Sequence, residues 1–494
     1  MAINKSMEGS KKSITKKDEM EPSNSIFLVL SSCFLFLLVV ARKGSTVERS
    51  EAQINVTAHH HQTVKLNSFL PSSICSPSIN GDKKRGSLEV VHKHGPCSKL
   101  SKDLVKPLTV EEIFSHDQSR VDSFINTGRK DIQGSKTTLP AKSGRTIGTE
   151  NYIVTIGLGT PKKDLSLAFD TGSHLTWTQC QPCAVTCYSQ YEPIFEPSSS
   201  TTYSNISCTS SECAELPSAT GKPPGCISSA CVYRMGYGDG SVTNGLFGKD
   251  KLTLNSDDVI DGFFFGCGQN NYGLFGGAAG LLGLGKDKLS IVSQSASKYG
   301  NHEVFSYCLP ATASSTGYLT FGSSGIGRNV VYTPLLTTKL GKSYYALDLE
   351  AIYVSGNKLA ISPTVFTTSG MIIDSGTVIT RLPSTAYAAL REAVRAEMTQ
   401  YPLTQAISIF DTCYDLSQYS DVTIPKISMV WGGKVNVEIP SQGILYPIPD
   451  SQVYCLAFAG NQYIGIFGNT QQKTLQVVYD VTGGKVGFAA GGCA

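Results

Sequence analysis

Two short acidic motifs are the parts of this chain best suited to chemistry. Asp170 opens a DTG tripeptide, and about two hundred residues later Asp374 opens a DSG tripeptide. Two carboxyl groups held about 3 Å apart cannot both ionise, so they share one proton. One member then serves as a base and the other as an acid. Such a pair can activate water against a carbonyl group, and it needs no metal, cofactor or covalent intermediate.

Each acid is expected at the end of an apolar strand. Residues 151–173 (NYIVTIGLGTPKKDLSLAFDTGS) alternate apolar positions, turn at Gly-Thr-Pro and lead into Asp170, and residues 369–377 (SGMIIDSGT) lead into Asp374. An apolar-apolar-Gly segment follows each copy downstream, LLG at 281–283 and IFG at 466–468. One tripeptide alone is compatible with an ordinary Asx turn. Two copies with matching flanks predict two similar lobes built mainly of strands.

Further motifs extend this pattern into a family resemblance. In chain order they read DTGSHLTW, YGDGS, FGCG, GLLGLG, FSYCL, IIDSGT and IFGN. Over residues 148–494 the chain resembles the pepsin family of aspartic proteases, and within it the plant group of nepenthesins and chloroplast-nucleoid DNA-binding proteases. The resemblance implies a mainly β, bilobal pepsin-like fold with a central cleft and a few short helices. It also implies an aspartic endopeptidase made as a zymogen, with lobes at 147–335 and 336–494.

The same resemblance implies roles for residues around the two acids. Two hydroxyls and two backbone N–H groups are expected to hold the carboxylates, from Ser173, Thr377, Gly172 and Gly376. Tyr237 matches the tyrosine of a flap that closes over the substrate, and Trp177 matches its support. His174 stands where the plant group commonly has Asp. It is either a plain surface residue or a group whose protonation in mild acid shifts the pH profile of the pair.

The charge divides the 494 residues into a basic leader and an acidic body. Residues 1–145 hold 22 Lys and Arg against 14 Asp and Glu, which leaves 20 basic and 25 acidic residues in the remainder. The apolar run at 26–41 follows several lysines and predicts a signal peptide over 1–41, with an uncleaved signal anchor as the alternative. Residues 42–146 are interpreted as a propeptide.

One stretch of the leader has helical spacing. In residues 105–124 the possible docking positions are Ile113, Val121 and Phe124. We expect the propeptide to lie across the acidic body and block it, and acid to release it by protonating carboxylates of the body.

Twelve of the 15 cysteines lie in the body, and an even number in an exported protein predicts six disulfides. The spacing Cys180-x-x-Cys183 also occurs in zinc and redox sites, but no second such pair or nearby His completes one. Cys413 with Cys455 is the preferred pair, and other pairings stay open. The twelve are Cys180, Cys183, Cys187, Cys208, Cys213, Cys226, Cys231, Cys267, Cys308, Cys413, Cys455 and Cys493.

Smaller signals complete the pattern. Asn55 and Asn205 open glycosylation sequons, which have meaning if the chain is exported. Residues 383–400 predict a helix that packs on the core of the second lobe, with Ser384 as its N-cap. GLLGLG lacks the GxGxxG order of a nucleotide fingerprint.

Two other functions compete with proteolysis. The same fold occurs in xylanase-inhibitor-like proteins that bind an enzyme without cleaving it, although loss of a catalytic turn commonly marks that branch. A basic leader also suits DNA binding, but its lysines are scattered. We expect polypeptide substrates and the propeptide as partners, no nucleic acid, and a monomer. Secretion to the apoplast or vacuole is favoured over the chloroplast.

Overall fold

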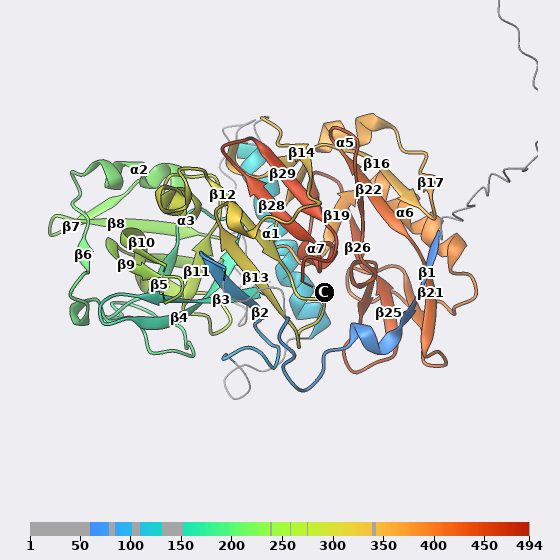
Figure 1. The fold of residues 1–494 in the computed structure, drawn as a ribbon, viewed down its shortest axis with the longest axis horizontal. Helices are drawn as coiled ribbons and strands as arrows, with labels where there is room; N and C mark the ends of the chain where they lie inside the picture. Colours follow the sequence, from blue (N-terminus) through green and yellow to red (C-terminus); the bar gives the residue numbers. More distant parts are fainter. Residues whose placement is uncertain are drawn as a thin grey trace, which may run out of the picture. The chain divides into compact units, whose positions relative to one another are not determined.

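The structure, a computed structural model, describes residues 60–78, 84–100, 109–130, 152–237, 240–256, 258–273, 275–337 and 342–493 (Figure 1). All of them belong to one compact unit, Ala58–Ala494. The predicted signal peptide, Asn55 and the boundary at 146/147 lie outside the described residues. Within the described part, no helix is long and apolar enough to cross a bilayer.

A sheet of 15 strands runs through both halves of the chain. Its alternating apolar residues face the main core, and a strand of the leader, β2, lies in its middle. The strands in spatial order are β14 (Val331–Pro334), β29 (Lys485–Ala489), β28 (Gln476–Asp480), β12 (Val304–Cys308), β13 (Thr316–Phe321), β2 (Ser87–His92), β3 (Tyr152–Leu158), β4 (Lys163–Asp170), β11 (Gly280–Gly283), β5 (Trp177–Gln179), β10 (Val259–Tyr272), β9 (Val242–Thr253), β8 (Ala230–Gly236) and β7 (Gly225–Ile227), with β6 (Ser204–Asn205) paired to β9.

Smaller sheets build the second half of the chain. One has five strands, in the order β15 (Ala346–Leu347), β18 (Met371–Ile373), β27 (Gly465–Phe467), β19 (Thr380–Pro383) and β26 (Phe458–Asn461). A four-stranded sheet has the order β17 (Asn357–Lys358), β16 (Leu349–Val354), β22 (Ile427–Trp431) and β23 (Val435–Glu438). A three-stranded sheet has the order β20 (Cys413–Asp415), β25 (Val453–Leu456) and β24 (Leu445–Pro447). In a two-stranded sheet, β1 (His61–Lys65) pairs with β21 (Asp421–Pro425).

The helices are few. They are α1 (Val110–Lys130), α2 (Ser211–Thr220), α3 (Ile291–Ser295), α5 (Pro363–Ser369), α6 (Ser384–Glu397) and α7 (Asn469–Gln472), with 3₁₀ turns η1 (Leu66–Phe69), η2 (Pro197–Ser199), η3 (Ala296–Tyr299), η4 (Ser323–Gly325) and η5 (Ser441–Gly443). Helix α6 confirms the helix predicted at 383–400, and its Leu390 and Val394 are buried. The predicted N-cap is wrong: Ser384 is the first helical residue, because Pro383 ends β19 with extended ψ and itself precedes the helix.

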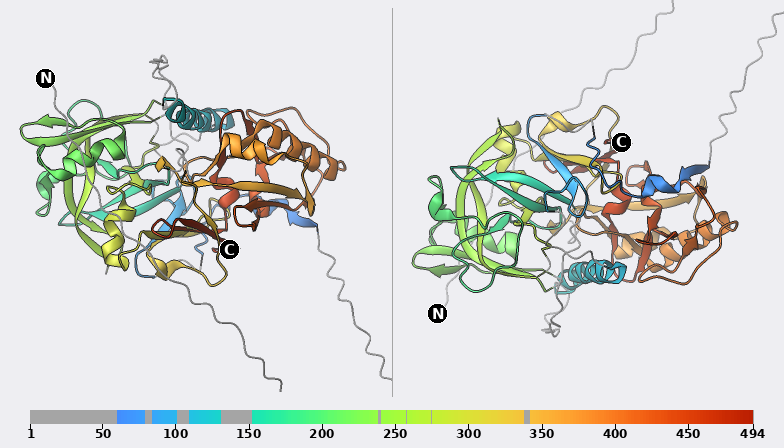
Figure 2. Two further views of the ribbon diagram at one scale, coloured as in Figure 1. Left: turned by 90° about the horizontal axis from the view of Figure 1, so that it is seen from above. Right: turned by 90° about the horizontal axis from the view of Figure 1, so that it is seen from below.

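Helix α1 lies between the green and orange halves, on the face opposite the C terminus (Figures 1 and 2). A capping box starts it: the Glu112 N–H donates to Thr109 Oγ1 (3.2 Å), and the Thr109 N–H donates to Glu112 Oε2 (2.9 Å). The first residues of the predicted stretch, 105–108, lie outside the described part. Val121 and Phe124 are buried against the second half, so the predicted docking face is confirmed.

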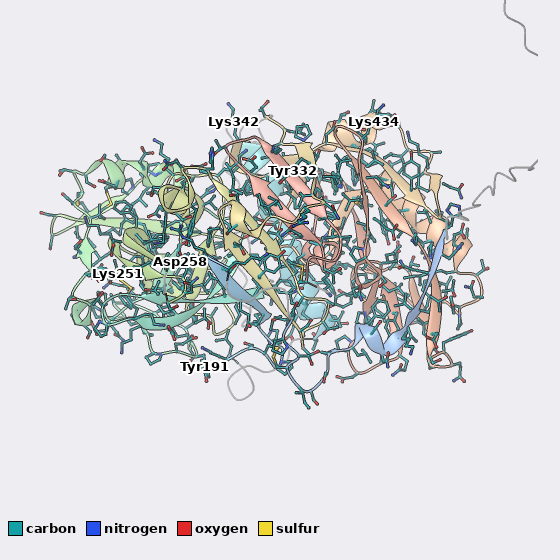
Figure 3. All side chains as sticks on the ribbon, in the orientation of Figure 1. Tyr191, Lys251, Asp258, Tyr332, Lys342 and Lys434 are labelled. Atoms are coloured by element: carbon teal, nitrogen blue, oxygen red, sulfur yellow. A yellow bond between two sulfur atoms is a disulfide. The ribbon has the colours of Figure 1, made fainter. Side chains whose placement is uncertain are left out.

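The leader also supplies strands, which the sequence analysis did not predict. β2 pairs antiparallel with β13 on one side and with β3 on the other. Leu88 and Val90 are buried in the main core. Just before β2, the Gly86 N–H donates a hydrogen bond of 2.6 Å to Asp258, whose side chain is labelled in Figure 3. Leader and body therefore share one sheet.

Seven disulfides occur among the described residues. Six of them pair the twelve body cysteines, which confirms that number and the Cys413–Cys455 pair. The CxxC cysteines bond elsewhere, and the leader has its own bridge. The other pairs are Cys75–Cys97, Cys180–Cys267, Cys183–Cys187, Cys208–Cys226, Cys213–Cys231 and Cys308–Cys493.

Candidate active site

Two matching strand arrangements position the two acids. β4 ends at Asp170, and β11 runs parallel beside it with Gly283 opposite Asp170. β18 leads into Asp374, and β27 runs parallel beside it with Phe467 opposite Ile373. The apolar-apolar-Gly segments found in the sequence are therefore the strands that flank each acid. Both carboxylates are buried at the ends of these strands.

The two acidic turns are hydrogen-bonded to each other. The Thr171 N–H donates to Ser375 Oγ (3.1 Å), and the Ser375 N–H donates to Thr171 Oγ1 (2.9 Å). This reciprocal pair fixes the two turns side by side. The sequence analysis did not assign these hydroxyls a role, although a hydroxyl residue follows each Asp in both motifs.

The four supporting residues implied by the resemblance lie around the carboxylates. Ser173 Oγ donates to Asp170 Oδ2, and Thr377 Oγ1 donates to Asp374 Oδ2 (2.5 Å). The Gly172 N–H donates to Asp170 Oδ1 (2.9 Å), and the Gly376 backbone bonds Asp374. These donors stabilise the charged forms and hold the orientation of both groups.

A leader residue, Arg120 of α1, bonds both acids. Its Nε donates to Asp374 Oδ2 (2.8 Å), and its Nη2 donates to Asp374 Oδ1 (2.9 Å) and to Asp170 Oδ1. Its side chain is 12% exposed. Side chains at Gly172 or Gly376 would collide with the guanidinium, so the close approach depends on both glycines. The leader therefore lies against both carboxylates in this structure.

The electrostatics of the site follow from this contact. Burial alone would raise the pKa of Asp374. The Arg120 guanidinium, the Thr377 hydroxyl and the Gly376 backbone outweigh it and hold that pKa below its ordinary value. The charged form of Asp374 is therefore favoured while α1 is docked.

One turn before Arg120, a second leader residue penetrates the body. Asp117 is fully buried; its Oδ1 accepts from the Val378 N–H (2.7 Å) and its Oδ2 accepts from Arg381 Nη2 (2.7 Å). The sequence analysis missed both Arg120 and Asp117. The available signal was their spacing of three residues, which places them on one side of a helix between apolar docking positions.

The predicted flap pair is brought together. Trp177 Nε1 donates to the Tyr237 hydroxyl (2.7 Å), and both rings make edge contacts with Phe275. Tyr237 follows β8 at the tip of the β8–β9 hairpin, where its N–H donates to the Ser241 carbonyl (2.8 Å). Trp177 and Phe275 therefore fix the position of the Tyr237 side chain.

His174 is not a plain surface residue. It packs against the chain near Gly285, and its Nδ1 is buried without a hydrogen-bond partner among the described residues. Burial lowers its pKa below 6.5, although the nearby Asp287 and Asp170 oppose this. This shift favours the neutral ring, whereas the pH-profile hypothesis requires the charged form. Of the two sequons, Asn205 is exposed in β6.

Comparisons with known proteins assign the chain to a family. Residues 152–323 match a family model described as Xylanase inhibitor N-terminal, and residues 344–490 match one described as Xylanase inhibitor C-terminal. An aspartyl protease family protein of Arabidopsis thaliana is 53% identical over 454 residues, or 90% of this chain and 95% of the relative. Aspartyl protease AED1 of the same plant is 50% identical over 467 residues, or 93% and 98%. The chain therefore belongs to the plant aspartyl protease family.

More distant relatives agree. Aspartic proteinase nepenthesin-2 of Nepenthes gracilis is 36% identical over 404 residues, which cover 79% of this chain and 87% of the relative. The solved structure of basic 7S globulin from soybean aligns with a TM-score of 0.55 at 22% identity, over 69% of this chain and 91% of that one. At this identity the likeness concerns the fold alone. The predicted mainly β, pepsin-like fold is confirmed.

Proposed function

We propose that this chain is the inactive precursor of an aspartic endopeptidase, with Asp170 and Asp374 as catalytic residues. One observation supports the proposal above all. The two buried carboxylates lie on turns that are hydrogen-bonded to each other, and both accept hydrogen bonds from the same guanidinium group. Groups that share one cation at bonding distance can share one water molecule and one proton once that cation has left. The substrates are polypeptides.

In the proposed reaction, the charged carboxylate takes a proton from a bound water, and the water oxygen attacks the scissile carbonyl carbon. The protonated carboxyl donates a hydrogen bond to the developing oxyanion, and a proton then passes to the leaving amine. Ser173 and Thr377 each fix one carboxylate oxygen, so the pair keeps its orientation while protons move. The two groups titrate as a coupled pair, so neither has a separate resting role. Tyr237 covers the substrate and excludes water.

The leader is the proposed inhibitor of its own catalytic site. Arg120 forms ion pairs with both carboxylates, and α1 fills the space in which a substrate would lie. Acid weakens this hold, because protonated carboxyls no longer pair with a guanidinium. We propose export through the secretory route, to the cell exterior or the vacuole. The apolar run at 26–41 supports this, and so do the disulfides, because disulfides form in oxidising compartments.

A second candidate function is partner binding without cleavage, which the descriptions of the two matching family models favour. Both acids and all four of their supporting residues are present in this chain, and this favours catalysis.

The test is digestion of an unfolded protein between pH 3 and 7 by the acid-treated full chain, with and without pepstatin, and with Asp170→Asn alongside. The proposal predicts acid-dependent cleavage that pepstatin inhibits and that Asp170→Asn lacks. Processed, disulfide-bonded protein that cleaves nothing yet binds and inhibits a xylanase would favour the second function.

A further inference from the structure

Arg381 is a buried cation of the body whose acidic partner comes from the leader. It lies in β19, four residues after Thr377, and its side chain is 1% exposed. Among the described residues its ion pair is with Asp117 of α1, at 2.7 Å. When α1 leaves the site, Arg381 loses this partner.

A buried guanidinium without a counterion is unfavourable, because it has given up hydration without an equivalent replacement. Arg381 Nε already has no hydrogen-bond partner within the described part of the chain. The Val378 N–H, which also donates to Asp117, loses its acceptor at the same time. Leader removal therefore frees a cation and a backbone donor that converge on one carboxylate position.

This position adjoins a pocket of about 520 Å³. Body residues in its wall include Arg381, Tyr387, Arg391, Asp411 and Asn461, and α1 contributes another part of the wall. Because α1 forms that part, its departure would widen the pocket beside Arg381.

The other charges in this wall are already balanced within the body. Arg391 pairs with Asp411 at 2.8 Å and with Glu392 at 2.9 Å, and Asp411 also accepts from the Tyr387 hydroxyl. Asn461 Nδ2 is a buried donor without a partner among the described residues. After the leader is lost, the unbalanced charge of the pocket is positive and lies on Arg381.

We propose that Arg381 and the Val378 N–H then bind an acidic side chain of the substrate, so that Arg381 determines specificity for Asp or Glu near the scissile bond. The inference rests on the proposed function, since it concerns the substrate of that same site. Asp117 precedes Arg120 by three helical residues, a rise of about 4.5 Å, which an extended peptide spans in one to two residues. The acidic side chain therefore lies within about two positions of the cut.

The experiment compares peptides with blocked termini that differ by Glu or Gln at each position within two residues of the cut, using acid-processed full chain. Blocked termini ensure that a side chain supplies the carboxylate. At pH 5.5 we expect kcat/KM about tenfold higher for Glu at one position, because a charge-assisted hydrogen bond is gained. At pH 3 the Glu carboxyl is protonated, and the ratio should fall towards one.

Variants of Arg381 test whether this residue causes the preference for Glu over Gln. Arg381→Met should bring the Glu/Gln ratio close to one, and Arg381→Lys should keep it above one. Arg234→Met, a control that removes an exposed arginine of β8 outside this pocket, should retain the full ratio. Should Arg381→Met fail to fold, the pH dependence of the wild type and the Arg381→Lys ratio decide the question.

The outcomes separate the two claims. Wild-type protein that cuts the Glu and Gln peptides equally at every position, or Arg381→Met that keeps the full ratio, would overturn the specificity inference and leave the peptidase standing. Wild-type protein that cuts none of the peptides would overturn the proposed function itself.

Discussion

At the residue scale, Thr377 offers a direct test of the catalytic pair. Its hydroxyl donates a hydrogen bond of 2.5 Å to Asp374. A hydrogen bond to the charged form of a carboxyl group lowers the pKa of that group. Its removal in Thr377→Ala should shift the acid limb of kcat/KM of the processed chain to higher pH. The maximal rate should fall about tenfold, the value of one charge-assisted hydrogen bond. A pH–rate profile checks this, with exposed Thr367→Ala as control, and an unmoved acid limb would contradict it.

Arg120 is expected to set the strength with which the leader binds over the two acids. Because the docked Asp374 has a lowered pKa, its contact with Arg120 stabilises docking above the ordinary Asp pKa of about 3.9 and is lost as the pH falls through the lowered value. Arg120→Ala should therefore activate at higher pH than wild type. The midpoint of activation against pH measures this, and Ser115→Ala, exposed on the same helix, should match wild type. Equal midpoints for Arg120→Ala and wild type would refute the role.

The sequence predicts the acids but not the residues that cover them. Asp170 and Asp374 stand out because the same tripeptide recurs on an apolar strand, and their hydroxyl and glycine supports lie within three residues of them. Arg120 and Asp117 are charged residues of a helix, which usually face water. Only the docking of α1 shows that their partners lie about 50 to 260 residues further along the chain.

At the element scale, basic groups gather where β2 ends, at His92, in the central sheet. His92 is half-buried opposite Tyr152, and their rings meet edge to face at 5.6 Å. Loss of hydration, followed by the positive charges of His94, Lys473 and Lys93, lowers the pKa of His92 well below 6.5. His92 therefore binds a proton less readily when β2 is docked than when β2 is free.

This cluster predicts release in mild acid. Docking of β2 is strongest above pH 6.5; below it, free His92 takes up a proton while docked His92 does not, so docking weakens as the pH falls. His92→Gln should make activation less sensitive to pH below about 6.5. The rate of activation against pH is the measurement, with exposed His302→Gln as control. A His92→Gln profile as steep as that of wild type would exclude this contribution.

Elements were predictable where their pattern is local. The helical spacing at 105–124 indicates α1 and its docking positions. The alternation of Leu88 and Val90 indicates a strand in hindsight, but basic residues surround it and its partners β13 and β3 lie far along the chain. Strand pairing over such separations depends on the whole fold, so the place of β2 in the sheet could not be predicted.

At the scale of the whole molecule, Cys308–Cys493 joins β12 to the end of the chain across 185 residues. A closed loop of this length restricts the unfolded chain, so replacing both cysteines by Ser should cost about 2–5 kcal/mol of unfolding free energy. Chemical denaturation of the full chain measures this. Replacing Cys183 and Cys187, only four residues apart, should cost much less. Equal losses for the two double variants would contradict the argument.

We infer that the carboxylates of Asp170 and Asp374 act together in peptide-bond hydrolysis. The most direct test is the rate at which the processed chain cleaves a denatured protein at pH 4, compared between wild type, Asp374→Asn and Asp261→Asn, an exposed control carboxylate. We expect wild type and Asp261→Asn to cleave at similar rates and Asp374→Asn to show no measurable cleavage. Cleavage by folded Asp374→Asn at the wild-type rate would contradict it.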